Sequence, residues 1–271
     1  MTKVSVVIPV FNQSQLTQRC LLSLLSHSHS LSRVWVIDNA SRDDTPAVLN
    51  RFHESFQQAG ISFEVITNPE NVGFGRACNQ GVREFLKTDA SHLVILNNDT
   101  WLMPSWDTAL IEAMKKRRLD AVGPYFHEKP FHDRMEQTAQ DFILRNGKGF
   151  RHHFVAILMF FSREAIIRLS QDCEGTHGGI FDERFFVTYE DADLLYRMRG
   201  LNMQYGQTGS CFIWHHSKAT RESGSLPSNY EREGLRLFIE KWGFDPIPAD
   251  HTWKARLRRR YWRIREKLGK F

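Results

Sequence analysis

Carboxylate, amide and imidazole side chains occur in short clusters along this chain, and such groups bind divalent cations and transfer protons. Amides and acids stand at Asn12, at Asp38-Asn39 and at Asn97-Asn98-Asp99. An acidic pair, Glu190-Asp191, and a pair of histidines, His215-His216, follow in the second half of the chain. These residue types are suited to metal-assisted or acid–base chemistry on a polar ligand.

Taken singly, each cluster also has a purely structural interpretation. Asp38 and Asp99 can cap helices, and an acidic pair is common in the first turn of a helix because of the helix dipole. The run Asn71-Val-Gly-Phe-Gly75 can be a tight turn whose glycines adopt positive φ. It is not a dinucleotide-binding fingerprint, because Cys78 stands where the third glycine should be.

The elements that would carry these clusters alternate along the first half of the chain. Apolar, β-branched runs predict buried strands, and amphipathic runs between them predict helices. The predicted strands are 4–10, 33–38, 63–67 and 92–96, and the predicted helices are 16–25, 46–58 and 75–86. This order predicts an α/β fold with a mostly parallel, Rossmann-like sheet covered by helices on both faces. The polar clusters then lie at the carboxyl ends of the strands, where open sheets bind ligands.

The alternation weakens after about Tyr125. We expect a strand within 154–162, a helix over 191–199, and short strands near 203–205 and 211–214. With no internal repeat and no long linker, residues 1–225 are predicted to form one domain, with a nucleotide-binding half at about 1–125 and an acceptor half at about 126–225. Residues 226–271 are predicted to form a C-terminal helical extension.

Composition excludes several classes of protein. Hydrophobic residues make up 41% of the 271 residues and charged residues 25%, as in ordinary globular proteins. The four cysteines are far apart, which argues against a disulfide framework or a zinc ribbon and fits a reducing cytosol. The longest apolar run, 154–161, is too short to span a bilayer. Residues 4–11 are interpreted as a first strand, not as a signal peptide.

The net charge of +5 comes from the last residues. Residues 251–271 hold nine Lys or Arg and one Glu, whereas the first 250 residues have a net charge of −3 and give no reason to expect nucleic acid as a partner. An apolar stripe recurs in this tail at helical spacing, through Trp253, Leu257, Tyr261, Ile264 and Leu268. The tail is either a helix packed on the domain or an interfacial helix on an anionic membrane; we expect the second over 252–271.

In combination, the clusters resemble the family 2 glycosyltransferases, inverting enzymes with a single nucleotide-sugar-binding domain of the GT-A fold. The resemblance covers residues 3 to about 220 and is nearest to bacterial rhamnosyltransferase-like and galactofuranosyltransferase-like members. It is carried, in order, by Val6-Val-Ile-Pro-Val-Phe-Asn12, Val36-Ile-Asp-Asn-Ala-Ser-Arg-Asp-Asp-Thr45, Asn71-Val-Gly-Phe-Gly-Arg-Ala-Cys-Asn79, Leu96-Asn-Asn-Asp-Thr100, Tyr189-Glu-Asp-Ala-Asp-Leu194 and Trp214-His-His216.

The resemblance implies a UDP- or dTDP-sugar donor. Asp38 would accept a hydrogen bond from the pyrimidine N3–H, which adenine cannot offer. Contacts to the sugar and the acceptor are expected from 125–161 and 178–189. The implied nucleotide-sugar-binding residues are Pro9, Phe11, Asn12, Asp38, Asn39, Gly73, Phe74, Gly75, Arg76, Asn79, Asn97 and Asn98.

The resemblance also implies a metal site and a base. Asp99 matches the last acid of the family's DxD motif, and with His215 it would bind Mg²⁺ or Mn²⁺ at the diphosphate. The first acid of that motif is Asn97 here, which weakens the expected site, and His216 is a second candidate ligand. Asp191 matches the general base that deprotonates the acceptor, and Glu190 would position it.

Two other functions compete with this one. A nucleotidyltransferase normally carries a Gly-rich, basic signature after the first strand, and Val10-Phe-Asn-Gln-Ser14 has none. An inactive GT-A-fold sugar-nucleotide-binding or scaffold protein should have lost the base or the metal acid, yet Asp191 and Asp99 are both present. We therefore expect a glycosyltransferase acting on a saccharide or lipid-linked saccharide for the cell envelope, peripheral on the cytoplasmic face of the inner membrane.

Overall fold

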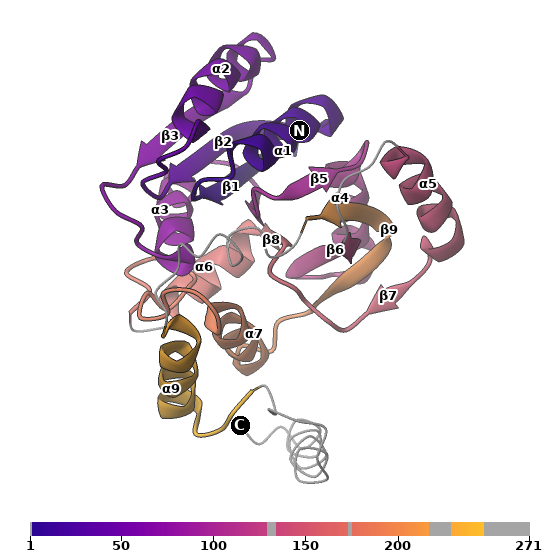
Figure 1. The fold of residues 1–271 in the computed structure, drawn as a ribbon. Helices are drawn as coiled ribbons and strands as arrows, with labels where there is room; N and C mark the ends of the chain where they lie inside the picture. The colour runs from indigo at the N-terminus through magenta and orange to yellow at the C-terminus, as the bar shows by residue number, and fades with distance from the viewer. Residues whose placement is uncertain (1, 129–133, 173–174, 217–228, 247–271) are drawn as a thin grey trace.

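The computed structural model describes residues 2–128, 134–172, 175–216 and 229–246 (Figure 1). Their centre is a nine-stranded sheet. Eight of its strands follow the order β3-β2-β1-β4-β8-β6-β9-β5, and the ninth, β7, pairs with β9. The predicted basic tail, 252–271, lies outside the described residues.

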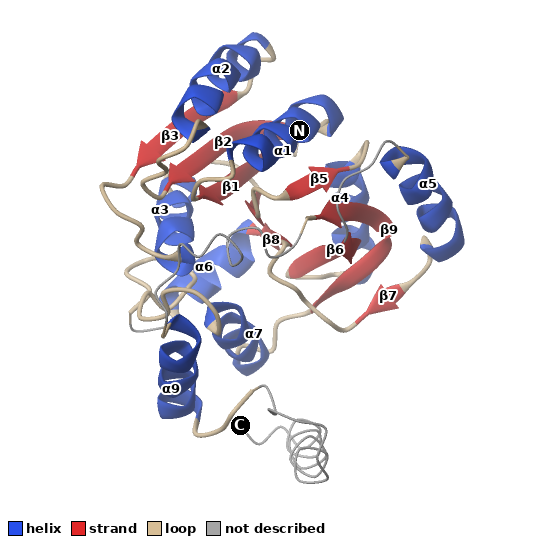
Figure 2. Ribbon diagram, in the orientation of Figure 1, coloured by secondary structure: helices blue, strands red, loops and turns tan. Residues whose placement is uncertain are grey.

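The first half of the sheet is parallel. β1 lies between β2 and β4, with Val7 opposite Trp35 and Ile95, and β2 pairs with β3 at the edge. Helices connect these strands, as Figure 2 shows. The elements are β1 (Val4–Val10), α1 (Ser14–His27), β2 (Leu31–Asp38), α2 (Thr45–Gln58), β3 (Ser62–Thr67), α3 (Phe74–Leu86) and β4 (His92–Leu96).

The second half of the sheet is mixed. β8 runs antiparallel to both β4 and β6, and β9 runs parallel to β6, so that β1–β4, β6 and β9 all point in one direction. The short strands β5 and β7 run antiparallel to β9. These strands are β5 (Thr100–Leu102), β6 (Ala121–Glu128), β7 (Phe150–Arg151), β8 (Leu158–Ser162) and β9 (Tyr205–His215).

Alternate residues of the central strands face two separate cores. Val6 and Ile8 pack under α1, α2 and α4 (Trp106–Arg117), whereas Val7 packs under α3, α6 (Arg163–Gln171) and α7 (Glu190–Gly200). A third cluster joins α5 (Met135–Asn146) to β6 and β9. The last described helix, α9 (Tyr230–Trp242), lies beside α7 (Figure 1). The sheet is thus buried on both faces, which explains its continuous apolar strands.

The predicted α/β class is confirmed: the sheet is mostly parallel and has helices on both faces, as expected. One detail was wrong: the two short strands expected near 203–205 and 211–214 are a single strand, β9. The register against β6 jumps between Pro124 and Tyr125, so that Gly209, Ser210 and Cys211 have no direct partner there. This irregularity interrupts the apolar pattern without ending the strand.

The alternation after Tyr125 looked weak because several elements are short or half-exposed. α5 buries only Met135 and Ala139, and β7 has two residues. Among the described residues, no helix has the length and apolar character needed to cross a membrane.

Candidate active site

A pocket of about 410 Å³ opens at one edge of the sheet. Strands β1, β2, β4, β6 and β9 run in the same direction, and residues at or just beyond the carboxyl end of each one line the pocket. The loop before α3 and the start of α7 complete the wall. The polar and aromatic lining residues are Phe11, Asn39, Asn71, Phe74, Asn97, Asn98, Asp99, Glu128, Phe186, Glu190, Asp191 and His215.

At Gly73 the loop before α3 lies in close backbone contact with the second half of the chain. Its φ is +88°, and a Cβ there would lie 2.3 Å from the carbonyl oxygen of Phe186. That carbonyl accepts a hydrogen bond of 2.8 Å from the Phe74 backbone N–H, and Asn39 donates from Nδ2 to the Gly73 carbonyl at 3.3 Å. Only glycine permits this approach, so the ends of β2, the glycine loop and the Phe186 loop form one wall.

Asp99 and His215 come together on the pocket wall. Asp99 Oδ1 lies 3.2 Å from His215 Nε2, and Glu128 Oε1 lies 3.6 Å from His215 Nδ1 on the other side of the ring. The backbone N–H of His216 also donates to the Asp99 carbonyl, at 2.9 Å. His215, and not His216, therefore carries the imidazole next to Asp99.

The donor set at this position fits a divalent cation. Adjacent ligands on an octahedral ion with bonds of 2.0–2.1 Å are about 3 Å apart, close to the separation of Asp99 and His215. Asn97 Oδ1 is buried with no hydrogen-bond partner, so it offers a further oxygen. Asn98 donates from Nδ2 to Thr17 Oγ1 at 2.9 Å. Within the described ranges, no three His, Cys, Asp or Glu side chains cluster as metal ligands.

The acidic pair lies at the amino end of α7. Asp191 is exposed and lines the pocket, and its Oδ1 accepts a hydrogen bond of 2.8 Å from the Ala192 backbone N–H. Glu190 is only 6% exposed. The preceding Thr188 and Tyr189 both have left-handed backbones, with φ of 69° and 68°. For a β-branched residue such as threonine this conformation is strained, and it turns the start of α7 toward the pocket.

Cysteine nucleophiles are excluded for the thiols that the structure describes. Cys20, Cys78 and Cys211 are all buried. Burial raises the pKa of Cys20 to about 12. Burial, and then the nearby Glu190 carboxylate, raise the pKa of Cys78 well above its usual range. Because the thiolate is the nucleophile, these buried thiols are not candidates for it, and none of them lines the pocket.

Several residues expected to bind the nucleotide lie outside the lining of this pocket. Asp38 is 3% exposed, and its Oδ1 accepts a hydrogen bond from the Ser41 backbone N–H at 3.0 Å. Arg76 pairs with Glu183 at 3.3 Å. Gly75 packs against Phe181, with a distance of 3.0 Å from an added Cβ to the Phe181 Cβ. Their assignment as ligands stays a prediction.

Asn79 is also outside the lining and is fully buried. Its Oδ1 accepts hydrogen bonds from the backbone N–H groups of Ile180 and Phe181, at 2.9 and 3.0 Å. Its Nδ2 donates to the Phe181 carbonyl at 2.8 Å. In the structure Asn79 holds the 176–183 segment against α3.

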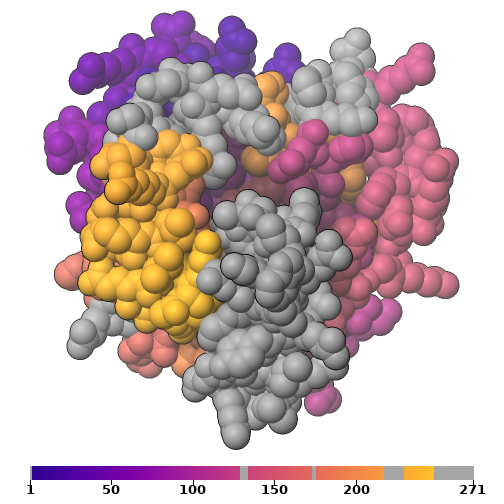
Figure 3. Space-filling view, turned by 60° about the horizontal axis from the view of Figure 1, so that its bottom comes forward, coloured from indigo at the N-terminus to yellow at the C-terminus, as the bar shows by residue number. Residues whose placement is uncertain are grey.

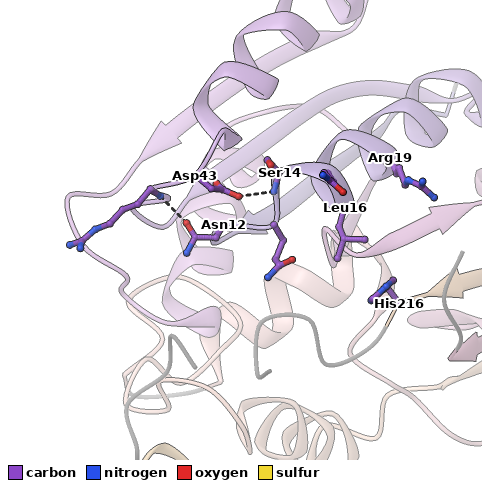
Figure 4. A pocket seen from close by; sticks show the side chains of 9 residues that line it. Asn12, Ser14, Leu16, Arg19, Asp43 and His216 are labelled. Atoms are coloured by element: carbon purple, nitrogen blue, oxygen red, sulfur yellow. Dashed lines mark hydrogen bonds between the residues drawn. The ribbon is translucent and has the colours of Figure 1, made fainter. Parts of the chain in front are cut away.

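An open groove of about 780 Å³ adjoins the pocket at the amino end of α1. Asn12, Arg19 and His216 border it (Figure 4). Asp43 accepts a hydrogen bond of 2.9 Å from the Ser14 backbone N–H and so caps this helix end. The predicted residue Asn12 therefore belongs to the groove, one residue beyond the pocket residue Phe11.

The pocket lining also includes residues that the sequence analysis did not name individually. They are Glu128, Val155–Ile157 and Phe186–Val187. They fall within the two segments expected to contact the sugar and acceptor. Their residue types carry no individual signal, because apolar loop residues and a strand-end glutamate are common in any α/β protein.

The sequence model described as "Glycosyl transferase family 2" matches residues 5–170. The glycosyltransferase AglE of Haloferax volcanii is 27% identical over 122 residues, which cover 44% of this chain and 38% of AglE. This chain thus aligns with less than half of that relative, and the base and histidine candidates lie beyond residue 170.

Solved structures share the fold. The mannosyltransferase PcManGT of Pyrobaculum calidifontis, in complex with GDP-Man and Mn²⁺, superimposes with a TM-score of 0.60 at 17% identity, over 90% of this chain and 66% of PcManGT. The structure of GalNAc-T7 with UDP, GalNAc and Mn²⁺ superimposes with a TM-score of 0.63 at 14% identity, over 89% of this chain and 49% of the GalNAc-T7 chain. At this identity the likeness shows the fold alone.

The hydrogen bonds of Asn79 lead to a first prediction. Asn79→Ala leaves buried backbone groups of Ile180 and Phe181 unpaired and should lower the free energy of unfolding by about 2–4 kcal/mol, as measured by urea denaturation. Gln80→Ala is the control, because the Gln80 amide bonds to the Asn68 side chain, and it should cost less. An Asn79→Ala protein with unchanged stability but lost UDP and dTDP binding would instead make Asn79 a ligand.

Proposed function

The chain belongs to glycosyl transferase family 2, and we propose that it is an inverting glycosyltransferase that moves a sugar from a UDP- or dTDP-sugar to a saccharide hydroxyl. The observation that carries this proposal is the presence of Asp191 and the Asp99–His215 pair in the lining of one pocket. The Asp191 carboxylate is exposed and can transfer a proton. The Asp99 carboxylate lies next to His215, in a set of donor atoms suited to the cation of a bound diphosphate.

In this proposal Asp191 is the general base. It takes the proton of the acceptor hydroxyl while that oxygen forms its bond to the anomeric carbon, and the bond to the nucleoside diphosphate breaks on the opposite face. The products are the glycoside with inverted configuration and UDP or dTDP. Glu190, largely buried beside Asp191, keeps the start of α7 in place.

The donor would lie across the strand ends. Pro9, Phe11 and Asn39 offer one wall of the pocket for the nucleoside, and Gly73-Phe74 lets the backbone come close. Asp38 directly precedes Asn39 and is the acceptor proposed for the pyrimidine N3–H. A strand-end carboxylate in this position would select UDP or dTDP over ADP, because adenine has no matching N–H.

Asp99, His215 and the Asn97 amide oxygen would hold a divalent ion, Mg²⁺ or Mn²⁺. Such an ion neutralises charge that develops on a departing diphosphate and acts as a template. In the protein itself, the Asp99–His215 contact and Glu128 orient the imidazole toward the pocket.

The base assignment is tested with Asp191→Asn. The amide is isosteric but cannot take a proton, so turnover should fall roughly 10²- to 10⁴-fold in kcat with little change in donor affinity. Turnover is read as release of the donor's own nucleoside diphosphate (UDP, dTDP or GDP) across a panel that includes dTDP-rhamnose, UDP-galactofuranose and GDP-mannose. Glu190→Gln is the matched control and should lose less.

Two results of this panel would contradict the proposal. Near-normal release by Asp191→Asn would remove Asp191 from the base role. A wild-type protein that binds a nucleotide sugar but turns over none would favour an inactive binding or scaffold protein.

The metal site is tested by restoring the missing acid. Asn97→Asp adds a second carboxylate where a buried amide oxygen has no hydrogen-bond partner, so Mn²⁺ affinity in the presence of UDP should rise about tenfold. Free Mn²⁺ is measured by electron paramagnetic resonance. Asn98→Asp adds the same charge beside Thr17 and should gain less. Equal gains from both variants would show that charge alone, and not a ligand position, sets the affinity.

We further propose that residues 252–271 attach the enzyme to an anionic membrane near a lipid-linked acceptor of the cell envelope. Each basic side chain near such a surface contributes on the order of 1 kcal/mol, so full-length protein should sediment with anionic vesicles and be released by high salt. Equal sedimentation of a protein ending at residue 250 would exclude the tail as the anchor, and neutral vesicles are the control.

A further inference from the structure

We infer that α9 is a positioning element for the base, and that Lys241 holds the segment 182–193 in its working shape from both of its ends. This inference rests on the proposed role of Asp191. The segment lines the pocket with Phe186, Val187, Glu190 and Asp191. It lies beyond residue 170, where the family match ends.

One ammonium group joins the two ends of this segment. Lys241 Nζ lies 2.8 Å from Asp182 Oδ2 and 2.7 Å from Asp193 Oδ1. Both carboxylates are completely buried. Trp242, the next residue of α9, donates from Nε1 to Asp193 Oδ1 at 2.9 Å. The loop between the two aspartates is therefore closed at its base by a helix that follows it by some forty residues.

The charges of this cluster depend on each other. Burial opposes ionisation of Asp182, but hydrogen bonds from Arg184 and Lys241 hold its pKa far below its usual range. Burial likewise opposes the charge of Lys241, and Asp193 and Asp182 raise its pKa. Arg197 completes the cluster through its Nε bond of 3.0 Å to Asp193. Buried charges are stable only when paired. Arg184 pairs with Asp182 and Arg197 with Asp193, whereas Lys241 of α9 contacts both carboxylates and so links the two ends of the segment.

A second contact acts directly on the strained residues before the base. Gly234 of α9 faces them: a Cβ at Gly234 would lie 2.9 Å from Tyr189 Cδ2 and 3.0 Å from Thr188 Oγ1. The Phe238 ring, fully buried, packs 5.9 Å from the Tyr189 ring. The left-handed conformations of Thr188 and Tyr189 persist because this packing over-determines them.

The two contacts act on opposite sides of Asp191. Lys241 and Trp242 hold Asp193, two residues after it, and Gly234 and Phe238 hold Tyr189, two residues before it. In the space-filling view α9 is the gold surface at the side of the molecule (Figure 3). Because misplacement of a reacting group by about 1 Å can cost roughly 10²-fold in rate, the docking of α9 sets kcat without touching the donor.

The test compares Lys241→Met with Arg236→Met. Arg236 also makes two ion pairs on α9, to Glu233 and Glu240, but on its exposed side. Lys241→Met should lower kcat for UDP or dTDP release about 10- to 100-fold, while the Kd for UDP or dTDP stays within about twofold of wild type. Arg236→Met should leave both unchanged, and Lys241→Arg should recover part of the lost kcat.

Hydrogen–deuterium exchange gives a readout independent of activity. Residues 182–193 should exchange faster in Lys241→Met than in wild type, with β1–β4 unchanged. If Lys241→Met does not fold, Gly234→Ala replaces it: alanine favours the helix, but its Cβ must displace Tyr189 or Thr188. Gly234→Ala should then show the same loss of kcat and the same local exchange.

The inference is overturned if Lys241→Met and Gly234→Ala keep wild-type kcat while Asp191→Asn loses it, or if Arg236→Met loses as much as Lys241→Met. An active Asp191→Asn protein would instead refute the proposed base. In that case hydrogen–deuterium exchange of residues 182–193 in Lys241→Met still decides whether Lys241 holds the segment. Unchanged exchange rejects this role of Lys241, and faster exchange confined to the segment supports it.

Discussion

The site depends on the common direction of five strands. β1, β2, β4, β6 and β9 all end at the same edge of the sheet, so side chains from distant parts of the chain meet there without long loops. Asp99 follows β4, His215 ends β9 and Glu128 ends β6. Their contacts follow from strand register, since Glu128 and His215 are direct partners across the β6–β9 pair.

A second constraint links the pocket wall to the base. The Gly73–Phe186 backbone contact and the Asn79 hydrogen bonds tie the first half of the chain to the 176–189 segment. Residues 176–189 have little regular structure of their own. They pack against α3 on one side, through Asn79, and against α9 on the other, through Gly234 and Phe238. The left-handed residues Thr188 and Tyr189 lie where Gly234 of α9 approaches this segment, and Phe238 packs against the Tyr189 ring.

Asn97 stands where the family's DxD motif has its first acid. An amide at this position keeps a side-chain oxygen but lacks the negative charge of a carboxylate. Asn97 lines the same pocket as Asp99 and His215, and its Oδ1 is buried with no hydrogen-bond partner. An orphaned acceptor costs free energy, so an oxygen of this kind in the pocket is in keeping with the proposal that a cation binds there.

The sequence by itself determined the first half of the fold and the residues that meet there. The predicted strands 4–10, 33–38, 63–67 and 92–96 match β1–β4 to within two residues. Buried parallel strands are continuous apolar runs, and a polar residue stands within two positions after the end of each one. The resemblance to family 2 glycosyltransferases pointed to Asp99, Asp191 and His215, with His216 as a second candidate ligand, and the roles of these residues stay predictions.

Only the tertiary structure decided which of these residues share a pocket and what holds them. It placed His215, not His216, beside Asp99, and it gave Asn79 a clamping contact that its motif position did not reveal. Lys241, Gly234 and Phe238 look like ordinary helix residues in the sequence. Their contacts with residues 182–193 span some fifty positions of the chain. Periodicity records only which face of an element is buried and carries no information about the partner on that face.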